Sequence, residues 1–351
     1  MMSAPTPEPA PSTSPLDNAA PAKLNNPGDL IAAAPHLMGY YPIDALVVNI
    51  IVGTTVEMTM CCDLPLDTLP ESLTGHLATI VTRYPDALVI GVVVGGGTPV
   101  GHTLPRDILV TRLRDAISGH NASLNMFWTP AITAGARWYD YDNPSHAGTV
   151  PDPKTTVLAV QAAVQGQRTL DSRADLAALL RPDPQDVLAR RATVIKTLLT
   201  RPGRRRSASH SYRLVIEQVQ RTPERSEALS DHDIAALAVA LTDYTVRDAC
   251  IATATGEHAH AAEQLWTELT RQCPAPQRAE PAALLAMSAY LRGNGGLASL
   301  ALDRAQTAFP GHRLTRLLRA ALDSHMPPDT LRPLVHQAAQ DAKRMGLTEP
   351  S

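Results

Sequence analysis

The chain has 351 residues, of which 44% are hydrophobic and 19% are charged, and its formal net charge is −3. This length predicts two domains of ordinary globular composition. Residues 1–150 carry 6 cations and 13 anions whereas residues 151–351 carry 25 and 21, so neither half has the charge of a polyanion binder, and no nucleic-acid partner is expected.

Residues 1–25 are expected to form a disordered tail. They are rich in Pro, Ala, Ser and Thr and have no periodic apolar face that could offset the entropy of ordering. The N-terminal residues do not show the basic region followed by an apolar region that is typical of a signal peptide. No run approaches the roughly 18 apolar residues of a membrane span. We therefore expect a cytoplasmic protein that does not bind membranes and keeps its four cysteines reduced.

Residues 26–150 predict an α/β domain with a mixed sheet. Two apolar runs flank Gly53 and indicate a hairpin, and the almost continuously apolar run 87–94 is typical of a central strand covered on both faces. Because strands and helices alternate, the fold class is α/β. The expected strands are 45–52, 56–62, 87–94, 124–129 and 137–141, and the expected helices begin near residue 27 and span 70–83 and 105–118.

Residues 151–351 predict an all-α half, which follows a break near residues 146–156. Residues 151–229 are expected to be a helical connector with an arginine-rich break at 201–206, and residues 230–351 a tetratricopeptide-like domain. This last prediction comes from small residues spaced along 280–322, where paired helices could approach closely. The expected helices are 155–166, 172–180, 185–200, 209–221, 231–253, 258–272, 280–292, 296–308, 312–323 and 328–345.

Three motifs are candidate chemical sites. Gly95–Gly97 follows a strand where a phosphate-binding loop would lie, but its spacing departs from G-x-G-x-x-G and Pro99 lacks an amide donor, which favours a plain connection. His258 and His260 point apart on a helix and cannot hold one metal ion together. The arginines of 201–206 lack interleaved aromatic residues and favour a solvated linker. No cofactor and no metal site is therefore predicted.

The segment from Pro35 to Val47, in which a helix ends at a glycine and a proline turn enters a strand, resembles an actinobacterial family known only as the domain of unknown function 4192 family. Three further segments are similar to that family, namely 63–65, 137–141 and 246–248, and so is the block from 266 to about 328. The resemblance implies the fold but no activity. It also leads us to expect serine at Ala45 and arginine at Cys61, so a family activity at these positions could be lost in this chain.

Two hypotheses for function follow. The first is a non-catalytic adaptor that binds a protein partner through its C-terminal helices, and it is favoured because no catalytic constellation is found. The second is an enzyme or small-ligand-binding module at the strand ends, where open α/β sheets place ligands. Its candidate ligand-binding residues are His36, Asp44, Asp63, Arg137 and Asp140. Of these, Asp63 and Arg137 are expected to form an ion pair if the strand ends bring them together.

Overall fold

The computed structural model describes residues 26–53, 55–64, 75, 77–79, 81–82, 87–101, 103–119, 123–164, 168–200, 207–324 and 326–347. The tail 1–25, most of the expected helix 70–83 and the arginine-rich segment 201–206 lie outside the described residues. No helix in the described ranges is both long and apolar enough to cross a bilayer.

The strands form one mixed sheet in the order β2-β1-β3-β4-β5-β6. β3 and β4 are parallel, because α3 (Asp107–Ile117) crosses between them, and the other neighbours are antiparallel. The strands are β1 (Ala45–Val52), β2 (Thr55–Asp63), β3 (Leu88–Val94), β4 (Ser123–Thr129), β5 (Arg137–Asp140) and β6 (Ala147–Thr149). The predicted hairpin, the central position of β3 and the mixed sheet are confirmed.

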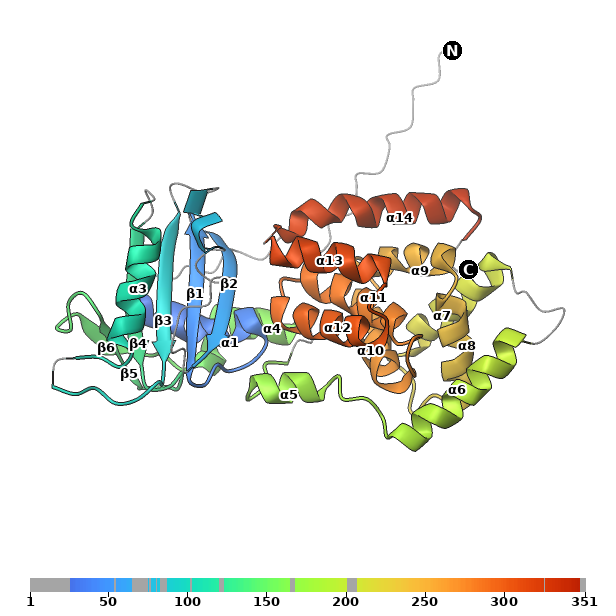
Figure 1. Ribbon diagram of the computed structural model, residues 1–351, viewed down its shortest axis with the longest axis horizontal. Coiled ribbons are helices and arrows are strands. Elements are labelled where there is room, and N and C mark those ends of the chain that lie inside the picture. The colour runs from blue at the N-terminus through green and yellow to red at the C-terminus, as the bar shows by residue number, and fades with distance from the viewer. Residues whose placement is uncertain are drawn as a thin grey trace, which may run out of the picture.

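The sheet is the middle of three layers, with α3 on one side and α1 (Pro27–Met38) on the other (Figure 1). Alternation along the strands fills both faces: Val93 packs with the α3 side, and Val92 packs with the α1 side. The aromatic residues of β4 and β5 pair across the strands in the same way, with ring centroids 5.6 Å apart for Phe127–Trp138 and 5.9 Å apart for Trp128–Tyr139. Cross-strand packing thus accounts for these four aromatic residues.

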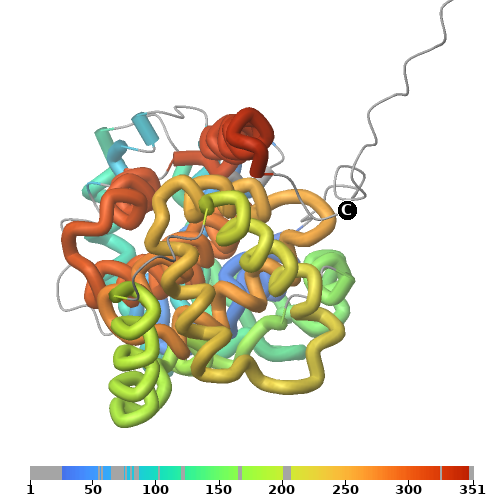
Figure 2. The backbone as a smooth tube through the Cα atoms, turned by 90° about the vertical axis from the view of Figure 1, so that its right-hand side faces the viewer, coloured from blue at the N-terminus to red at the C-terminus, as the bar shows by residue number. Residues whose placement is uncertain are grey.

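The second half of the chain is helical and lies beside the sheet (Figures 1 and 2). Its elements are η2 (Pro153–Thr155), α4 (Val157–Val164), α5 (Arg173–Ala178), α6 (Gln185–Thr200), α7 (Ala208–Arg221), α8 (Asp231–Leu241), α9 (Tyr244–Cys250), η3 (Ile251–Ala254), α10 (Ala259–Gln272), α11 (Ala279–Leu291), α12 (Gly295–Ala308), α13 (Arg313–Asp323), η4 (Pro328–Leu331) and α14 (Arg332–Arg344). The all-α second half is therefore confirmed, and the tetratricopeptide geometry stays a prediction.

The expected helix 231–253 is in fact two α-helices and a short 3-10 helix. Asp243 interrupts it, because its side chain accepts the backbone N–H of Thr245 at 2.9 Å and starts α9 anew. At the beginning of α8, Ser230 and Asp233 form a capping box. Side-chain capping thus explains both the start of α8 and the break between α8 and α9, which the sequence did not predict.

The two halves share one continuous hydrophobic core on the α1 side of the sheet. At their junction Gly39, with φ of +79°, ends α1 against Asn294, and a Cβ on it would lie 2.7 Å from the Asn294 amide nitrogen. The next residue, Tyr40, bridges to Leu170 ahead of α5. β6, which the sequence did not predict, lies inside the stretch where we expected the break between the halves.

Candidate functional site

The start of β1 and the ends of β3 and β4 meet at one edge of the sheet, since Ala45 pairs with Val94 and Val94 with Thr129. Asp44 occupies this edge in a left-handed conformation, with φ of +44°. Its carboxylate accepts the N–H of Gly96 at 2.9 Å, and its carbonyl accepts the N–H of Leu64 at 2.6 Å. One residue thereby ties together the entry to β1 and the exits from β2 and β3.

The glycine loop is built around that carboxylate. Gly95 has φ of +67°, and a Cβ on it would lie 2.4 Å from Asp44 Oδ1. A bound phosphate would need the free amide donors of this loop, but the Asp44 carboxylate already takes the Gly96 N–H and adds a negative charge there. The loop therefore has a structural reason for its glycines, and its geometry opposes the binding of an anion.

Asp63 and Arg137 do not form the expected ion pair. They lie on β2 and β5, which three strands separate, so at the usual strand spacing they are about 19 Å apart. Asp63 instead faces Arg173 of α5, with 3.8 Å between Oδ2 and Nη1, and Arg137 lies over the ring of Tyr139, 5.4 Å from its centroid. The sequence placed both residues at strand ends but could not order the strands across the sheet.

His36 connects α1 to two segments of the helical half. Its Nε2 lies 2.8 Å from the carbonyl oxygen of Pro153, and its Nδ1 lies 2.8 Å from Thr169 Oγ1. A carbonyl can only accept, so Nε2 carries the proton and Nδ1 accepts from the threonine hydroxyl. With both ring nitrogens bonded within the chain, this side chain has the geometry of a structural cross-link.

Asp140 is the last residue of β5, and its side chain bonds to the turn that leads to β6. Its Oδ1 accepts the N–H of Asp142 at 2.8 Å, and its Oδ2 lies 3.0 Å from His146 Nδ1. Asp140 pairs with Phe127 in the body of β4, so it is set back from the edge that holds Asp44. The structure therefore brings Asp44 and Asp63 together at one strand end, because Ala45 pairs with Asp63. His36, Arg137 and Asp140 lie elsewhere, so the five candidate residues do not converge on one point.

The adjacent cysteines lie on opposite faces of β2: Cys61 packs with the α1 side and Cys62 with the α3 side. Burial raises the pKa of the Cys61 thiol to about 11, and burial also raises the pKa of Cys62. Both are neutral thiols at pH 7 and therefore poor nucleophiles. Ala45, where the resemblance implies serine, is fully buried at the start of β1 and offers no reactive group.

A polar cluster that the sequence analysis missed links three helices of the second half. His312 is buried, and its Nε2 lies 2.9 Å from Glu280 Oε2, while Arg247 Nη1 lies 3.2 Å from the same carboxylate. His312 Nδ1 accepts the N–H of Thr315 at 3.3 Å and caps α13, so Nε2 donates to Glu280. Only Arg247 carried a sequence signal, through its segment's resemblance to the family.

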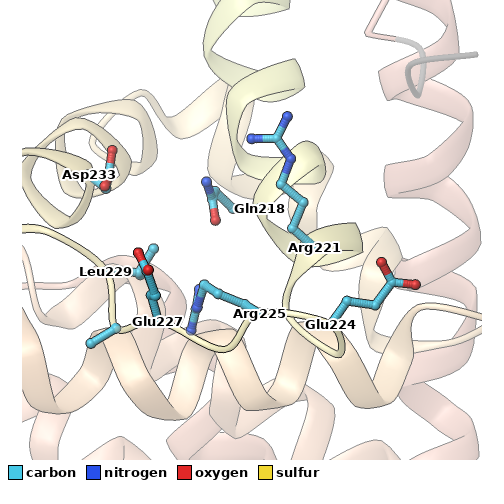
Figure 3. A pocket seen from close by; sticks show the side chains of 8 residues that line it. Gln218, Arg221, Glu224, Arg225, Glu227, Leu229 and Asp233 are labelled. Carbon is cyan, nitrogen blue, oxygen red and sulfur yellow. The ribbon is translucent and has the colours of Figure 1, made fainter.

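A second missed feature is an open hollow of about 420 Å³ beside the end of α7 and the beginning of α8 (Figure 3). Charged and amide side chains line most of it, and Leu229 is its buried apolar member. The lining residues are Gln218, Arg221, Glu224, Arg225, Glu227, Ala228, Leu229 and Asp233. Because they come from a turn and two helix ends, no periodic pattern in the sequence marks them.

Fold and site together define an α/β sandwich joined to a helical half, and in the described residues no group of three or more His, Cys, Asp or Glu side chains could hold a metal ion. The family model described as Domain of unknown function (DUF4192) matches residues 27–329. The chain therefore belongs to that family. No curated protein and no solved structure matches it significantly.

Proposed function

We propose that this chain is a non-catalytic protein-interaction module, an adaptor that acts in the cytoplasm. The observation that carries the proposal is the dispersal of the five polar candidates. His36, Asp44 and Asp140 are each hydrogen-bonded within the fold, and Asp63 and Arg137 lie far apart across the sheet. A catalytic site needs such groups within reach of one substrate atom.

An exposed apolar stripe on α4 supports a protein partner. Val157, Val160 and Val164 are 56%, 57% and 83% exposed and occupy one face of this eight-residue helix, which has no charged side chain. Exposed apolar patches commonly mark protein interfaces. The C-terminal helices add Leu317 and Leu334 as exposed leucines, which fits our expectation of a partner that binds the helical half.

The alternative, a small-ligand site at the strand ends, has one specific observation in its favour. Arg106, just before α3, holds a left-handed backbone with φ of +63°, and its Nε is buried without a hydrogen-bond partner in the described part of the chain. It lies beside Gly96, whose N–H the Asp44 carboxylate already accepts. Arg106 is thus the residue on which a ligand-binding role at this edge would depend.

The test starts from the full chain immobilised in a lysate of its own source organism. A retained protein is identified, purified and titrated back by calorimetry. The adaptor proposal predicts a stoichiometric complex that Val160→Lys weakens by about tenfold or more without lowering Tm. Ile108→Lys is the matched control, because Ile108 is 71% exposed on α3, on the other side of the sheet. Retention of a small molecule alone, lost in Arg106→Ala, would favour the alternative.

A further inference from the structure

The outer face of α13 combines exposed apolar and cationic side chains. Residues three or four apart share one face of a helix, so Arg313, Arg316, Leu317 and Ala320 lie together, and all four are exposed. Leu317 is 60% exposed, and Phe309, in the turn that leads into α13, is 46% exposed. Figure 1 shows α13 at the outside of the helical half, which agrees with the exposure of this face.

The two exposed arginines have no anionic partner. In the described part of the chain neither Arg313 nor Arg316 pairs with a carboxylate. A third arginine of the helix, Arg319, differs, because it bonds to Ser299 and Asp303 of α12 and so fastens α13 to its neighbour. Arg313 and Arg316 therefore contribute charge to the surface but no ion pair that holds the fold.

The position of these two charges opposes the stability of α13. Arg313 is the first residue of the helix and Arg316 follows three residues later, so both lie near the positive end of the helix dipole. They also repel each other at this spacing. The first turn holds no acidic residue that could offset them. Two unpaired cations in an unfavourable position, beside two exposed apolar side chains, suggest a role in binding an anionic and partly apolar ligand.

We propose that this face of α13 binds an acidic amphipathic segment of a partner protein. The inference rests on the adaptor function and assigns that function a site and a ligand chemistry. Apolar side chains of the segment cover Phe309 and Leu317, and its carboxylates pair with the guanidinium groups of Arg313 and Arg316. A protein fits this face better than an anionic membrane, because electrostatic binding to lipids generally uses clusters of about four to eight basic residues.

The test measures fluorescence anisotropy of the full chain with two labelled amphipathic peptides, one of leucine, alanine and glutamate and one with lysine in place of glutamate. We expect saturable binding of the glutamate peptide only. The double variant Arg313→Glu/Arg316→Glu should weaken this binding by about tenfold or more. The same variant should gain binding of the lysine peptide, which a misfolded chain could not do. Leu317→Ser should also weaken binding of the glutamate peptide.

The controls are the same changes at exposed residues on other helices. Arg213→Glu on α7, and Leu199→Ser on α6, where Leu199 is 53% exposed, should leave binding of the glutamate peptide unchanged. The single variant Arg313→Glu should raise Tm, because it places an anion at the beginning of α13 and removes the repulsion from Arg316. A lower Tm would show that Arg313 holds the fold and would contradict the proposal.

The proposal fails if the glutamate peptide does not bind, if the lysine peptide binds the parent equally well, or if the control changes weaken binding as much. It also fails if vesicles of phosphatidylglycerol and phosphatidylcholine bind the chain and displace the peptide, which would indicate a membrane surface. The adaptor function is judged separately with the partner retained from lysate. If that partner binds the double arginine variant as tightly as the parent, the adaptor stands and this face is not its site. If no protein is retained yet the glutamate peptide binds as expected, the reverse holds.

Discussion

Arg191 is the most heavily bonded buried charge described in the helical half. It is 7% exposed, and its guanidinium reaches Asp183 at 2.7 Å, Asp231 at 2.8 Å and the carbonyl of Gln272 at 2.9 Å, which joins α6, α8 and α10. Removing it leaves Asp231 with only the exposed Arg190 and Asp183 with only Arg271, at 3.8 Å. We expect Arg191→Ala to lower the free energy of unfolding by about 3–5 kcal/mol in urea denaturation. Arg190→Ala, which removes a neighbouring exposed arginine from the same Asp231, is the control and should change it little.

The same cluster predicts a pH dependence of stability. Hydrogen bonds from Arg190 and Arg191 hold the pKa of the Asp231 carboxyl below its usual value of 3.8. A carboxyl whose pKa falls on folding stabilises the protein above its unfolded pKa, so this contribution is present at neutral pH and lost as pH falls below about 4. The acid-induced loss of stability should be shallower in Asp231→Asn. An unchanged pH profile would contradict this assignment.

Asp63 and Arg137 behave as independent surface residues in this account. Asp63 is exposed and faces an exposed Arg173, so Asp63→Ala should cost less than about 1 kcal/mol. Because the two residues lie far apart, the melting effects of Asp63→Ala and Arg137→Ala should add within about 0.5 kcal/mol. Strong non-additivity in the double variant would show a direct contact and would mean that the strand order is wrong.

The four thiols are expected to be inert in the folded chain. Burial raises the pKa of Cys61 to about 11 and of Cys273 to about 12, and it also raises the pKa values of Cys62 and Cys250. At pH 7.5 all four are neutral, so an aromatic disulfide reagent should label the native protein far more slowly than the unfolded protein. A single fast-reacting thiol would indicate an activated cysteine and would favour the hypothesis of an enzyme.

At the scale of elements, the glycine loop after β3 tests whether its glycines are needed for the contact with Asp44. Gly95→Ala meets both a positive φ and the Asp44 carboxylate, whereas Gly53→Ala meets a positive φ of +61° with no atom within 4 Å. Gly95→Ala should therefore cost at least about 1 kcal/mol more than Gly53→Ala in thermal melts. An equal loss of stability in the two variants would show that the contact with Asp44 does not constrain residue 95.

The strands and most helices could be predicted because their signals are local. A continuous apolar run marks β3, helical periodicity marks α7, and capping residues mark the start of α8. Strand order is not local, which is why Asp63 and Arg137 were expected to pair. The hollow beside α7 depends on a turn brought against α10, and β6 is too short for an alternating pattern.

At the scale of the molecule, the continuous core between sheet and helices predicts cooperative unfolding. Val92 and Trp266 belong to the same cluster although they come from different halves. We expect calorimetry to show one transition with equal calorimetric and van't Hoff enthalpies. Two separate transitions would contradict this and would support independent domains divided near residues 146–156.

The central claim is that the strand-end polar residues form no ligand site, whereas an exposed helical surface binds a partner. Calorimetric titration of the retained partner into two variants tests it most directly. The account predicts that the double variant Asp63→Ala/Arg137→Ala binds with the parent Kd, whereas Val160→Lys binds about tenfold or more weakly. Lost binding in the double variant with intact binding in Val160→Lys would contradict the account.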